Sequence, residues 1–513
     1  MTAPTHSIPQ PLASSGGSAL TTLAGRLIFG LLTLLLLAIV VLWQQFGEPI
    51  GRGFAAAVAA LVFTLHLILA RTRISAFDPV VWIPISMLLF YFGVPIAVEV
   101  INPGGDVSYD PWRVGIVPNL ERGLTTALLG MTAYIWGVYL IGLKDLSGHP
   151  STRAADRSLL IPALIFTLGS TAMVAGGIAL VGPSVVFGYY NDWWAAKAAG
   201  ADARWIDIGL VFMQAGVYAL LASVGREQRL ARYFAYAVSF AIIVMTVQKG
   251  ARAQLVAFGI GAAWCYSQRI RRVRPSVAVG VAVAALLVMP VLKEWRHSRT
   301  VEATRSASVQ ELAAAAFRET GSSVYTIVYT MHLIPSTRSY AWGASYWDST
   351  LHAIPNLGLT PGKFWGKIVL ENHPSRWITF QLNPEWYFAG GGYGSSMVAE
   401  LYFNFGIIGV ALGATIFGIL TALVRNSAQG SSMKLVASAL FFGAMAIHVR
   451  NVIGVPIKMV AWPLIGLYLI RKTMEVLGGK PLPAPDHGPN ADLARRESAL
   501  GRRPDGAGPE FGA

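Results

Sequence analysis

Leu27-Ile-Phe-Gly-Leu-Leu-Thr-Leu-Leu-Leu-Leu-Ala-Ile-Val-Val-Leu-Trp43 is the first long uncharged stretch of the sequence, and nearly all of its side chains are apolar. Its 17 residues approach the roughly 20 apolar residues that cross a bilayer as one helix. The stretch is long for the core of a signal peptide, and residues 1–25 before it contain no Lys or Arg. We therefore interpret it as a first membrane span that is not cleaved.

Similar apolar runs recur as far as Arg471. Hydrophobic residues make up 54% of the chain and charged residues 13%, and the mean hydropathy is +0.52. Soluble domains carry about 25% charged residues. The sequence thus predicts an all-α polytopic integral membrane protein. We expect about twelve spans, at residues 24–43, 53–70, 79–98, 123–143, 158–181, 206–224, 231–247, 253–268, 275–292, 402–424, 433–448 and 453–471.

The basic residues in the short loops are unevenly distributed, with sixteen on one side of the expected spans and eight on the other. By the positive-inside rule the richer side is cytoplasmic, so both termini are expected in the cytoplasm of a bacterium, with the spans in its inner membrane. Because most of the basic residues lie in these short loops, membrane orientation explains the formal net charge of +14, and no nucleic-acid partner is expected. Five regions follow: 1–23 is a disordered cytoplasmic N-terminus, 24–292 holds nine spans, 293–395 is a large periplasmic loop, 396–471 holds three spans, and 472–513 is a disordered basic cytoplasmic tail.

The predicted periplasmic loop is too long for a simple connection, and loops of this length usually have a function. Ser308-Val-Gln-Glu311 has the pattern of a capping box, and a helical pattern continues from it until Pro335. Short helices are also expected at 346–354 and 361–370. The loop is therefore predicted to be structured and helical.

Aromatic residues are frequent in this loop. Trp347, Trp377, Trp386 and Tyr387 are candidates for stacking against sugar rings, because aromatic faces offer flat apolar surfaces. Trp and Tyr also settle at membrane interfaces without any ligand. The sequence leaves both interpretations open.

A glycine-rich turn near Gly394 leads into a helix that either Ser395 or Ser396 caps. The helix can run to Val424, about 43 Å at 1.5 Å per residue. Because a hydrocarbon core is about 30 Å thick, the first turns, with Glu400, are expected to project above it. A glycine-flanked helix N-terminus is a natural anion site, so Gly394, Ser395 and Ser396 are candidate diphosphate ligands.

Several cations lie on the side that is poorer in basic residues. Lys249 and Arg252 flank one short turn, Arg450 lies in another, and Arg318 lies in the loop. Single residues of this kind can also be membrane-interface anchors. The single Cys265 excludes a disulfide within the chain and a thiolate zinc cluster, and no phosphate-binding or metal-binding motif is found. We expect no metal and no cofactor.

These features resemble the Wzy-type family of O-antigen and polysaccharide repeat-unit polymerases. The segments that carry the resemblance are Gln248-Lys-Gly-Ala-Arg252, Arg318-Glu-Thr-Gly321, Ile354-Pro-Asn356, Asn383-Pro384, Gly394-Ser-Ser-Met-Val-Ala-Glu-Leu-Tyr-Phe-Asn-Phe-Gly406 and Arg450. The resemblance implies a membrane-embedded, GT-C-like glycosyltransferase. Such an enzyme moves a glycan from undecaprenyl diphosphate onto the next lipid-linked repeat unit, in contact with membrane lipid. The resemblance makes a chain-length regulator protein a candidate partner.

The chemistry of that reaction suggests a role for each candidate. A diphosphate leaving group needs cations, and Lys249, Arg252, Arg318 and Arg450 are the candidates. The acceptor hydroxyl needs a group that removes or orients its proton, for which Glu400 or Glu319 is suitable.

Two other functions share parts of this pattern. An O-antigen ligase uses the same donor but transfers the glycan to lipid A core. A transporter or flippase would usually place carboxylates at the centre of its spans. No expected span has a central Asp or Glu, and His66 and Lys458 are the main ionisable residues inside apolar runs. The polymerase is therefore favoured.

Overall fold

The computed structural model describes most of the chain between Ser15 and Leu477. The described residues are 15–46, 51–71, 74–103, 119–145, 156–188, 193, 196, 203–225, 227–249, 252–271, 273–274, 276–277, 280, 283–284, 308–354, 372–388 and 391–477. The predicted terminal segments 1–14 and 478–513 and the predicted helix 361–370 lie outside them. The ninth expected span, 275–292, lies almost wholly outside them.

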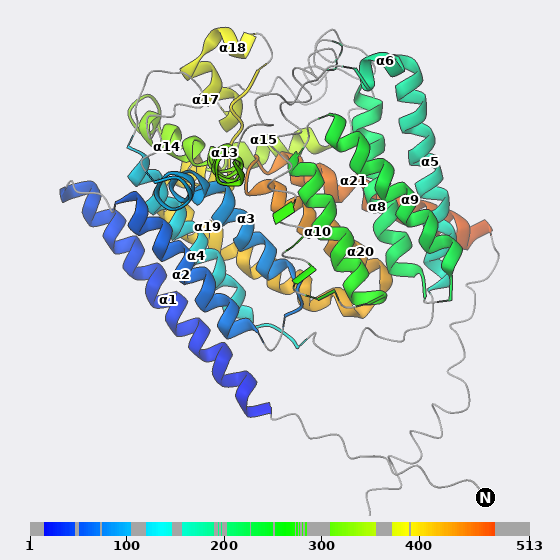
Figure 1. Cartoon of the computed structure of the whole chain (residues 1–513), viewed down its shortest axis with the longest axis horizontal. Helices are drawn as coiled ribbons and strands as arrows, with labels where there is room; N and C mark the ends of the chain where they lie inside the picture. The colour runs from blue at the N-terminus through cyan, green and yellow to red at the C-terminus, as the bar shows by residue number, and fades with distance from the viewer. Residues whose placement is uncertain are drawn as a thin grey trace, which may run out of the picture.

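The described chain is helical, and no strand occurs in these ranges, as expected for an all-α protein (Figure 1). The helices of the first half are α1 (Ser15–Phe46), α2 (Arg52–Ala70), α3 (Pro79–Pro95) with the π-helix η1 (Ile96–Ile101), α4 (Leu120–Ile141), α5 (Arg157–Val181), α6 (Pro183–Val186), α8 (Ala203–Ser223), α9 (Arg229–Gln248) and α10 (Arg252–Arg269). The second half contains α13 (Val309–Gly321), α14 (Val324–Leu333), α15 (Ala344–Ala353), α17 (Pro374–Leu382), α18 (Pro384–Phe388), α19 (Met397–Ser427), the short 3-10 helix η3 (Ala428–Gly430), α20 (Ser432–His448) and α21 (Gly454–Leu477).

Nine described helices are long and apolar enough to cross a membrane. They are Thr21–Leu42, Arg52–Ala70, Pro79–Ile101, Leu120–Ile141, Ser158–Val181, Trp205–Ser223, Arg229–Gln248, Met397–Gly430 and Gly454–Leu477. Each coincides with an expected span. The expected spans 253–268 and 433–448 are present as α10 and α20, of which α20 is a shorter apolar helix. A total of twelve spans stays a prediction.

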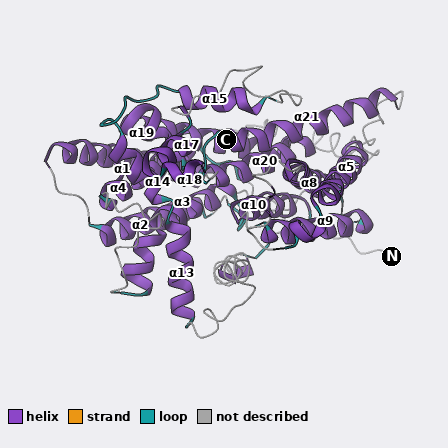
Figure 2. Ribbon diagram, turned by 90° about the horizontal axis from the view of Figure 1, so that it is seen from above, coloured by secondary structure: helices purple, strands orange, loops and turns teal. Residues whose placement is uncertain are grey.

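The helices pack around two main hydrophobic cores. One core joins α1, α2, α3, α4, α14 and α19, and the other joins α5, α8, α9, α10, α20 and α21. Helix α20 contributes to both, because Met445 and Val449 at its end belong to the first core whereas Leu435 and Phe442 belong to the second. Figures 1 and 2 show the two groups of helices side by side.

In the first core, the backbones of α4 and α19 approach each other closely at two glycines. A Cβ atom added to Gly137 would lie 2.0 Å from the carbonyl oxygen of Thr415, and one added to Gly418 would lie 2.0 Å from that of Tyr134. Only glycine permits this approach of two backbones, which is typical of helix pairs in membranes. The contact fixes α19, which carries Glu400, against the bundle.

The short helices α13, α14, α15, α17 and α18 gather at one end of the bundle, which we call the loop end (Figure 1). The capping box at Ser308 is present, with Glu311 contacting the backbone N–H of Ser308 at 2.7 Å, as predicted. The predicted helix from there to Pro335 is instead two helices, since α13 ends at Gly321, where helix propensity is low. The short helix expected at 346–354 is present as α15, whereas α17 and α18 were not predicted. Helices α14 and α17 share the first core, so they belong to the same packed body as α3, α4 and α19.

The opposite end of the bundle contains a buried ion pair. Arg425 on α19 donates to both carboxylate oxygens of Asp78, the residue that caps α3, at 2.7–2.9 Å, and both side chains are fully buried. The helix α19 continues to Ser427, a few residues beyond the expected end of this span at residue 424, so Arg425 lies in its last turn. The helix can extend because Asp78 and the carbonyl oxygen of Lys144 satisfy the buried guanidinium.

Candidate active site at the loop end of the helix bundle

The start of α19 is fixed by its cap. Ser396 is the N-cap residue, and its hydroxyl accepts from the backbone N–H of Ala399 at 3.2 Å and from the Thr326 hydroxyl of α14 at 2.9 Å. Gly394 before it has φ +79°, a conformation that favours glycine. Ser395 is buried, and its hydroxyl has no hydrogen-bond partner in the described part of the chain. Because Ser396 caps the helix and α14 contacts this cap, the predicted anion site at this N-terminus is enclosed.

Glu400 lies one turn further along and is fully buried. Its Oε1 accepts from the Ser345 hydroxyl of α15 at 3.0 Å, and its Oε2 accepts from the backbone N–H of Ile453 at 2.8 Å. Nδ1 of His448 lies 4.0 Å from the same Oε2 and donates to the carbonyl oxygen of Asn451 at 2.9 Å. In this conformation Glu400 joins α15, α19 and the turn between α20 and α21. It is not exposed to an acceptor sugar.

Asn404, one turn after Glu400, extends the same network. Its amide nitrogen donates to the Ser345 hydroxyl at 2.7 Å and to the carbonyl oxygen of Glu400 at 2.8 Å, and its Oδ1 accepts from the backbone N–H of Gly343 at 3.0 Å. The helix is broken shortly afterwards at Gly406, where φ is 65°. The sequence did not single out Ser345, Asn404 or His448. Asn404 lies within the segment that carries the family resemblance, which was the one available signal.

The network positions Arg450. Its guanidinium lies 5.6 Å from the centre of the Phe90 ring of α3, and the neighbouring carbonyl oxygen of Val449 accepts from the Tyr91 hydroxyl at 2.7 Å. The turn is therefore fixed to α3 on one side and, through Ile453, to Glu400 on the other. A cation held by two independent contacts keeps its position when a charged ligand approaches.

Arg318 lies on α13, which crosses α3 close to the turn that Phe90 occupies. A Cβ atom added to Gly93 would lie 2.4 Å from the carbonyl oxygen of Phe317, and one added to Gly321 would lie 2.3 Å from the backbone nitrogen of Val94. Gly321 therefore permits the close crossing of the two helices. Nε of Arg318 is buried without a hydrogen-bond partner among the described residues. Because residues 90 and 93 face the same side of α3, the backbone of α13 next to Arg318 and the guanidinium of Arg450 contact successive turns of one helix face.

Lys458 and Arg376 form a second group of positive charge. Lys458 lies near the start of α21, and Arg376 lies on α17, one of the short helices at the loop end. In the described ranges neither side chain is in an ion pair with a carboxylate.

Lys249 and Arg252 differ in their surroundings. Lys249 is buried, forms an ion pair with Asp207 of α8 and lies 4.9 Å from the ring centre of Trp193, so its charge is already balanced. Arg252 begins α10, which runs antiparallel to α20: Nε1 of Trp264 donates to the Ser438 hydroxyl at 3.0 Å, and Gly443 contacts Ala257. This register puts the backbone of Arg252 level with the end of α20, next to the Arg450 turn.

The four aromatic residues predicted to bind sugars differ in how much of each side chain is exposed. Trp377 has an exposed fraction of 3% and packs against Phe403, so it belongs to the core. Trp347 and Trp386 have exposed fractions of 65% and 47%. Tyr387 packs edge-on against Phe380 and Phe388. Of the four candidates, the two exposed tryptophans offer the largest free ring surfaces. Glu319, the other predicted proton acceptor, is half-buried on α13 beside Arg318.

Helices of membrane length, with several basic residues at the end where the short helices gather, define a polytopic membrane protein. The sequence profile of the family described as O-antigen polysaccharide polymerase Wzy matches residues 199–474, which is more than half of the chain. The chain belongs to this family, as its motifs indicated. Neither a curated protein nor a solved structure matches it. The match includes α8 to α21, and therefore Glu400, Arg318 and Arg450, whereas α3 lies before it.

Proposed function

We propose that this protein joins oligosaccharide repeat units that are linked to undecaprenyl diphosphate, at the periplasmic face of the bacterial inner membrane. Family membership gives the broad activity, a polymerising transfer of sugars. The observation that carries the finer proposal is the turn held by Glu400, which fixes Arg450 beside α3 close to the segment that carries Arg318. A positively charged site of this kind suits a diphosphate leaving group.

In the proposed reaction the acceptor hydroxyl oxygen forms a bond to the anomeric carbon of the donor glycan. The bond between that carbon and the diphosphate oxygen breaks, and undecaprenyl diphosphate leaves with the electron pair. Arg450, Arg318 and Arg252 stabilise this developing charge, as preorganised cations do in phosphoryl and glycosyl transfer. Lys458, near the start of α21, and Arg376, on α17, supply further positive charge at the same end of the bundle.

The proton of the acceptor hydroxyl requires an exposed base. Glu319 is the better candidate in this conformation. It lies beside Arg318 and its side chain is partly exposed, whereas the side chain of Glu400 is fully buried. We therefore propose Glu400 as a positioning residue that holds the Arg450 turn. Trp347 and Trp386 provide exposed ring faces for the sugars of the incoming unit.

The proposed orientation is the predicted one, with twelve spans and both termini in the cytoplasm. Two observations support it. Arg52 and Glu121, in the first turns of α2 and α4, lie 3.3 Å apart, and the expected order of the spans puts both helix starts on the periplasmic side. Lys144 and Arg425, predicted to be cytoplasmic, meet at the other end. A chain-length regulator as partner stays a prediction.

The function is tested by deleting the gene from its own host and by assaying the purified protein. Deletion is expected to reduce the lipopolysaccharide ladder to a single repeat on lipid A core. Loss of every repeat from the core would indicate a ligase, and accumulation of lipid-linked units on the cytoplasmic side would indicate a flippase. The purified protein with lipid-linked repeat units alone is expected to form lipid-linked polymer, and failure with a correctly folded preparation would overturn the proposal.

A further inference from the structure

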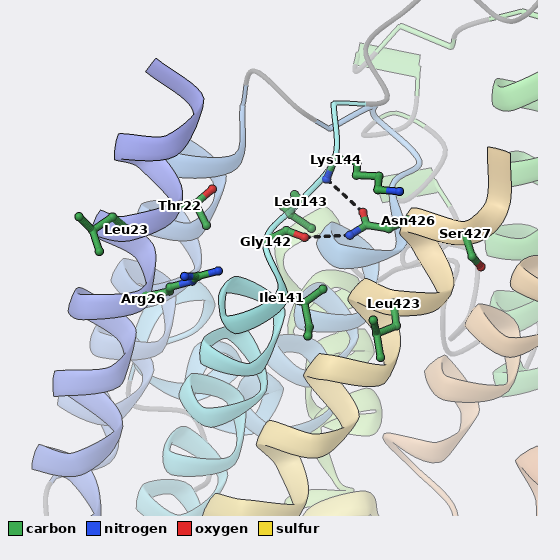
Figure 3. Close-up of a pocket in the computed structure, with 10 residues that line it drawn as sticks. All are labelled: Thr22, Leu23, Arg26, Ile141, Gly142, Leu143, Lys144, Leu423, Asn426 and Ser427. Carbon is green, nitrogen blue, oxygen red and sulfur yellow. Dashed lines mark hydrogen bonds between the residues drawn. The ribbon is translucent and has the colours of Figure 1, made fainter. Parts of the chain in front are cut away.

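A cleft lies at the opposite end of the bundle from the candidate active site, between α1, the end of α4 and the end of α19 (Figure 3). Its volume is about 620 Å³, within the range of small-molecule sites. The residues that line it are Thr22, Leu23, Arg26, Ile141, Gly142, Leu143, Lys144, Leu423, Asn426 and Ser427.

The base of this cleft is built by contacts within the chain. The Asn426 side chain bridges two elements, since its Oδ1 accepts from the backbone N–H of Lys144 at 3.1 Å and its Nδ2 donates to the carbonyl oxygen of Gly142 at 2.9 Å (Figure 3). Helix α1 packs onto α4 at Gly25, where an added Cβ would lie 2.3 Å from the Tyr139 ring. The polar atoms of Asn426 are therefore used internally, and the cleft has a fixed shape.

Two cations line the cleft. Nε of Arg26 donates to the carbonyl oxygen of Tyr139 at 2.9 Å, which fixes the plane of the guanidinium and leaves its other N–H groups for a ligand. Lys144 lies on the other wall, at the end of α4 (Figure 3). No ion pair with a carboxylate is found for either cation within the described ranges. The charge of the cleft is therefore complementary to an anion.

Exposed apolar side chains continue from the cleft along both helices. Leu23, Leu27 and Leu31 follow one another at four-residue spacing on α1, and their exposed fractions are 52%, 65% and 69%. Leu420 and Leu423 are exposed on α19. A ligand that matches both features has an anionic head and long apolar chains.

We propose that this cleft binds the phosphate headgroup of an anionic phospholipid through Arg26 and Lys144, with its acyl chains along α1 and α19. Basic pockets between membrane helices bind such headgroups in other proteins. The site is at the far end from the candidate active site, so it is independent of the glycan reaction. Its effect would be to hold α1 against α4 and α19, and the predicted orientation assigns it to the cytoplasmic leaflet.

Native mass spectrometry of the purified full-length protein tests the site, with dioleoylphosphatidylglycerol as probe and dioleoylphosphatidylcholine as the zwitterionic comparison. The wild type is expected to retain the anionic lipid preferentially. Arg26→Gln combined with Lys144→Gln is expected to weaken this binding roughly thirtyfold, because each basic residue near a headgroup contributes about fivefold. Arg71→Gln, which removes an exposed cation at the end of α2 outside the cleft, is the matched control and is expected to bind like the wild type.

Three results would overturn the proposal. One is equal retention of the anionic lipid by the double variant, and another is an equal loss in the Arg71 control. The third is displacement of the lipid by inorganic phosphate at matched concentration, which would indicate a site for free anions. If the double variant does not fold, crosslinking of the wild type with a photoactivatable phosphatidylglycerol decides the matter. Labelled peptides from α1 and α19 support the site, and labelling confined to other helices refutes it.

Discussion

Replacing Glu400 with either Ala or Gln distinguishes a positioning role from a catalytic one. Its carboxylate accepts hydrogen bonds from the Ser345 hydroxyl at 3.0 Å and the Ile453 backbone N–H at 2.8 Å, and it is fully buried. Glu400→Ala leaves both donors buried without this acceptor, at a cost of about 1–3 kcal/mol each. If that cost falls on the active conformation of the Arg450 turn, the population of this conformation drops by at least tenfold.

Glu400→Gln keeps one carbonyl oxygen for the Ile453 N–H and can donate its amide hydrogen to the Ser345 hydroxyl. Its expected cost is that of one altered hydrogen bond, about 0.5–1.5 kcal/mol, or about tenfold at most. A general base behaves differently, because an amide cannot take up a proton. Removal of a general base lowers the rate by about 10²–10⁴-fold. The two roles therefore predict different results for Gln.

The assay is the initial rate of polymer formation in membranes that contain lipid-linked repeat units, normalised to the amount of inserted protein. Melting temperatures of the purified variants report the structural cost separately. Glu475→Gln replaces a partly exposed glutamate near the end of α21, far from the candidate site, and serves as the control; it is expected to leave both readouts nearly unchanged. Our reasoning fails if Gln inactivates the protein as completely as Ala while both variants melt like the wild type.

Three further predictions address other parts of the molecule. Arg450→Ala is expected to abolish long chains at normal insertion, whereas Arg450→Lys retains part of the activity because the charge remains; full-length ladders in the Ala variant would exclude this role. Trp377→Ala is expected to destabilise the protein by about 3–5 kcal/mol in thermal unfolding because the ring is in the core, and Trp347→Ala is expected to leave the melting temperature unchanged but shorten the chains. Asp78→Ala is expected to cost about 3–5 kcal/mol because it leaves a buried guanidinium unpaired. Asp78→Ala combined with Arg425→Leu should recover part of that loss, and a double variant as unstable as the single one would argue against the pair.

The local sequence alone determined the features whose causes are local. Apolar runs identified the membrane helices because the bilayer requires about 20 apolar residues in a row. The cap at Ser308, and a second cap at either Ser395 or Ser396, were recognisable because each cap involves residues only three apart. The segment around Glu400 identified the family.

Only the tertiary structure decided what the side chains at the candidate site contact. Glu400 finds its partners 55 and 53 residues away, and Arg425 finds Asp78 at a separation of 347 residues. Sequence predicted that Glu400 would lie in the first turns of this helix, but it did not predict that long-range packing would enclose the side chain. The same packing buries Trp377 and leaves Trp347 exposed, although composition made them equivalent. A buried polar group must find a hydrogen-bond partner, and which partner it finds depends on helices that the local sequence does not bring together.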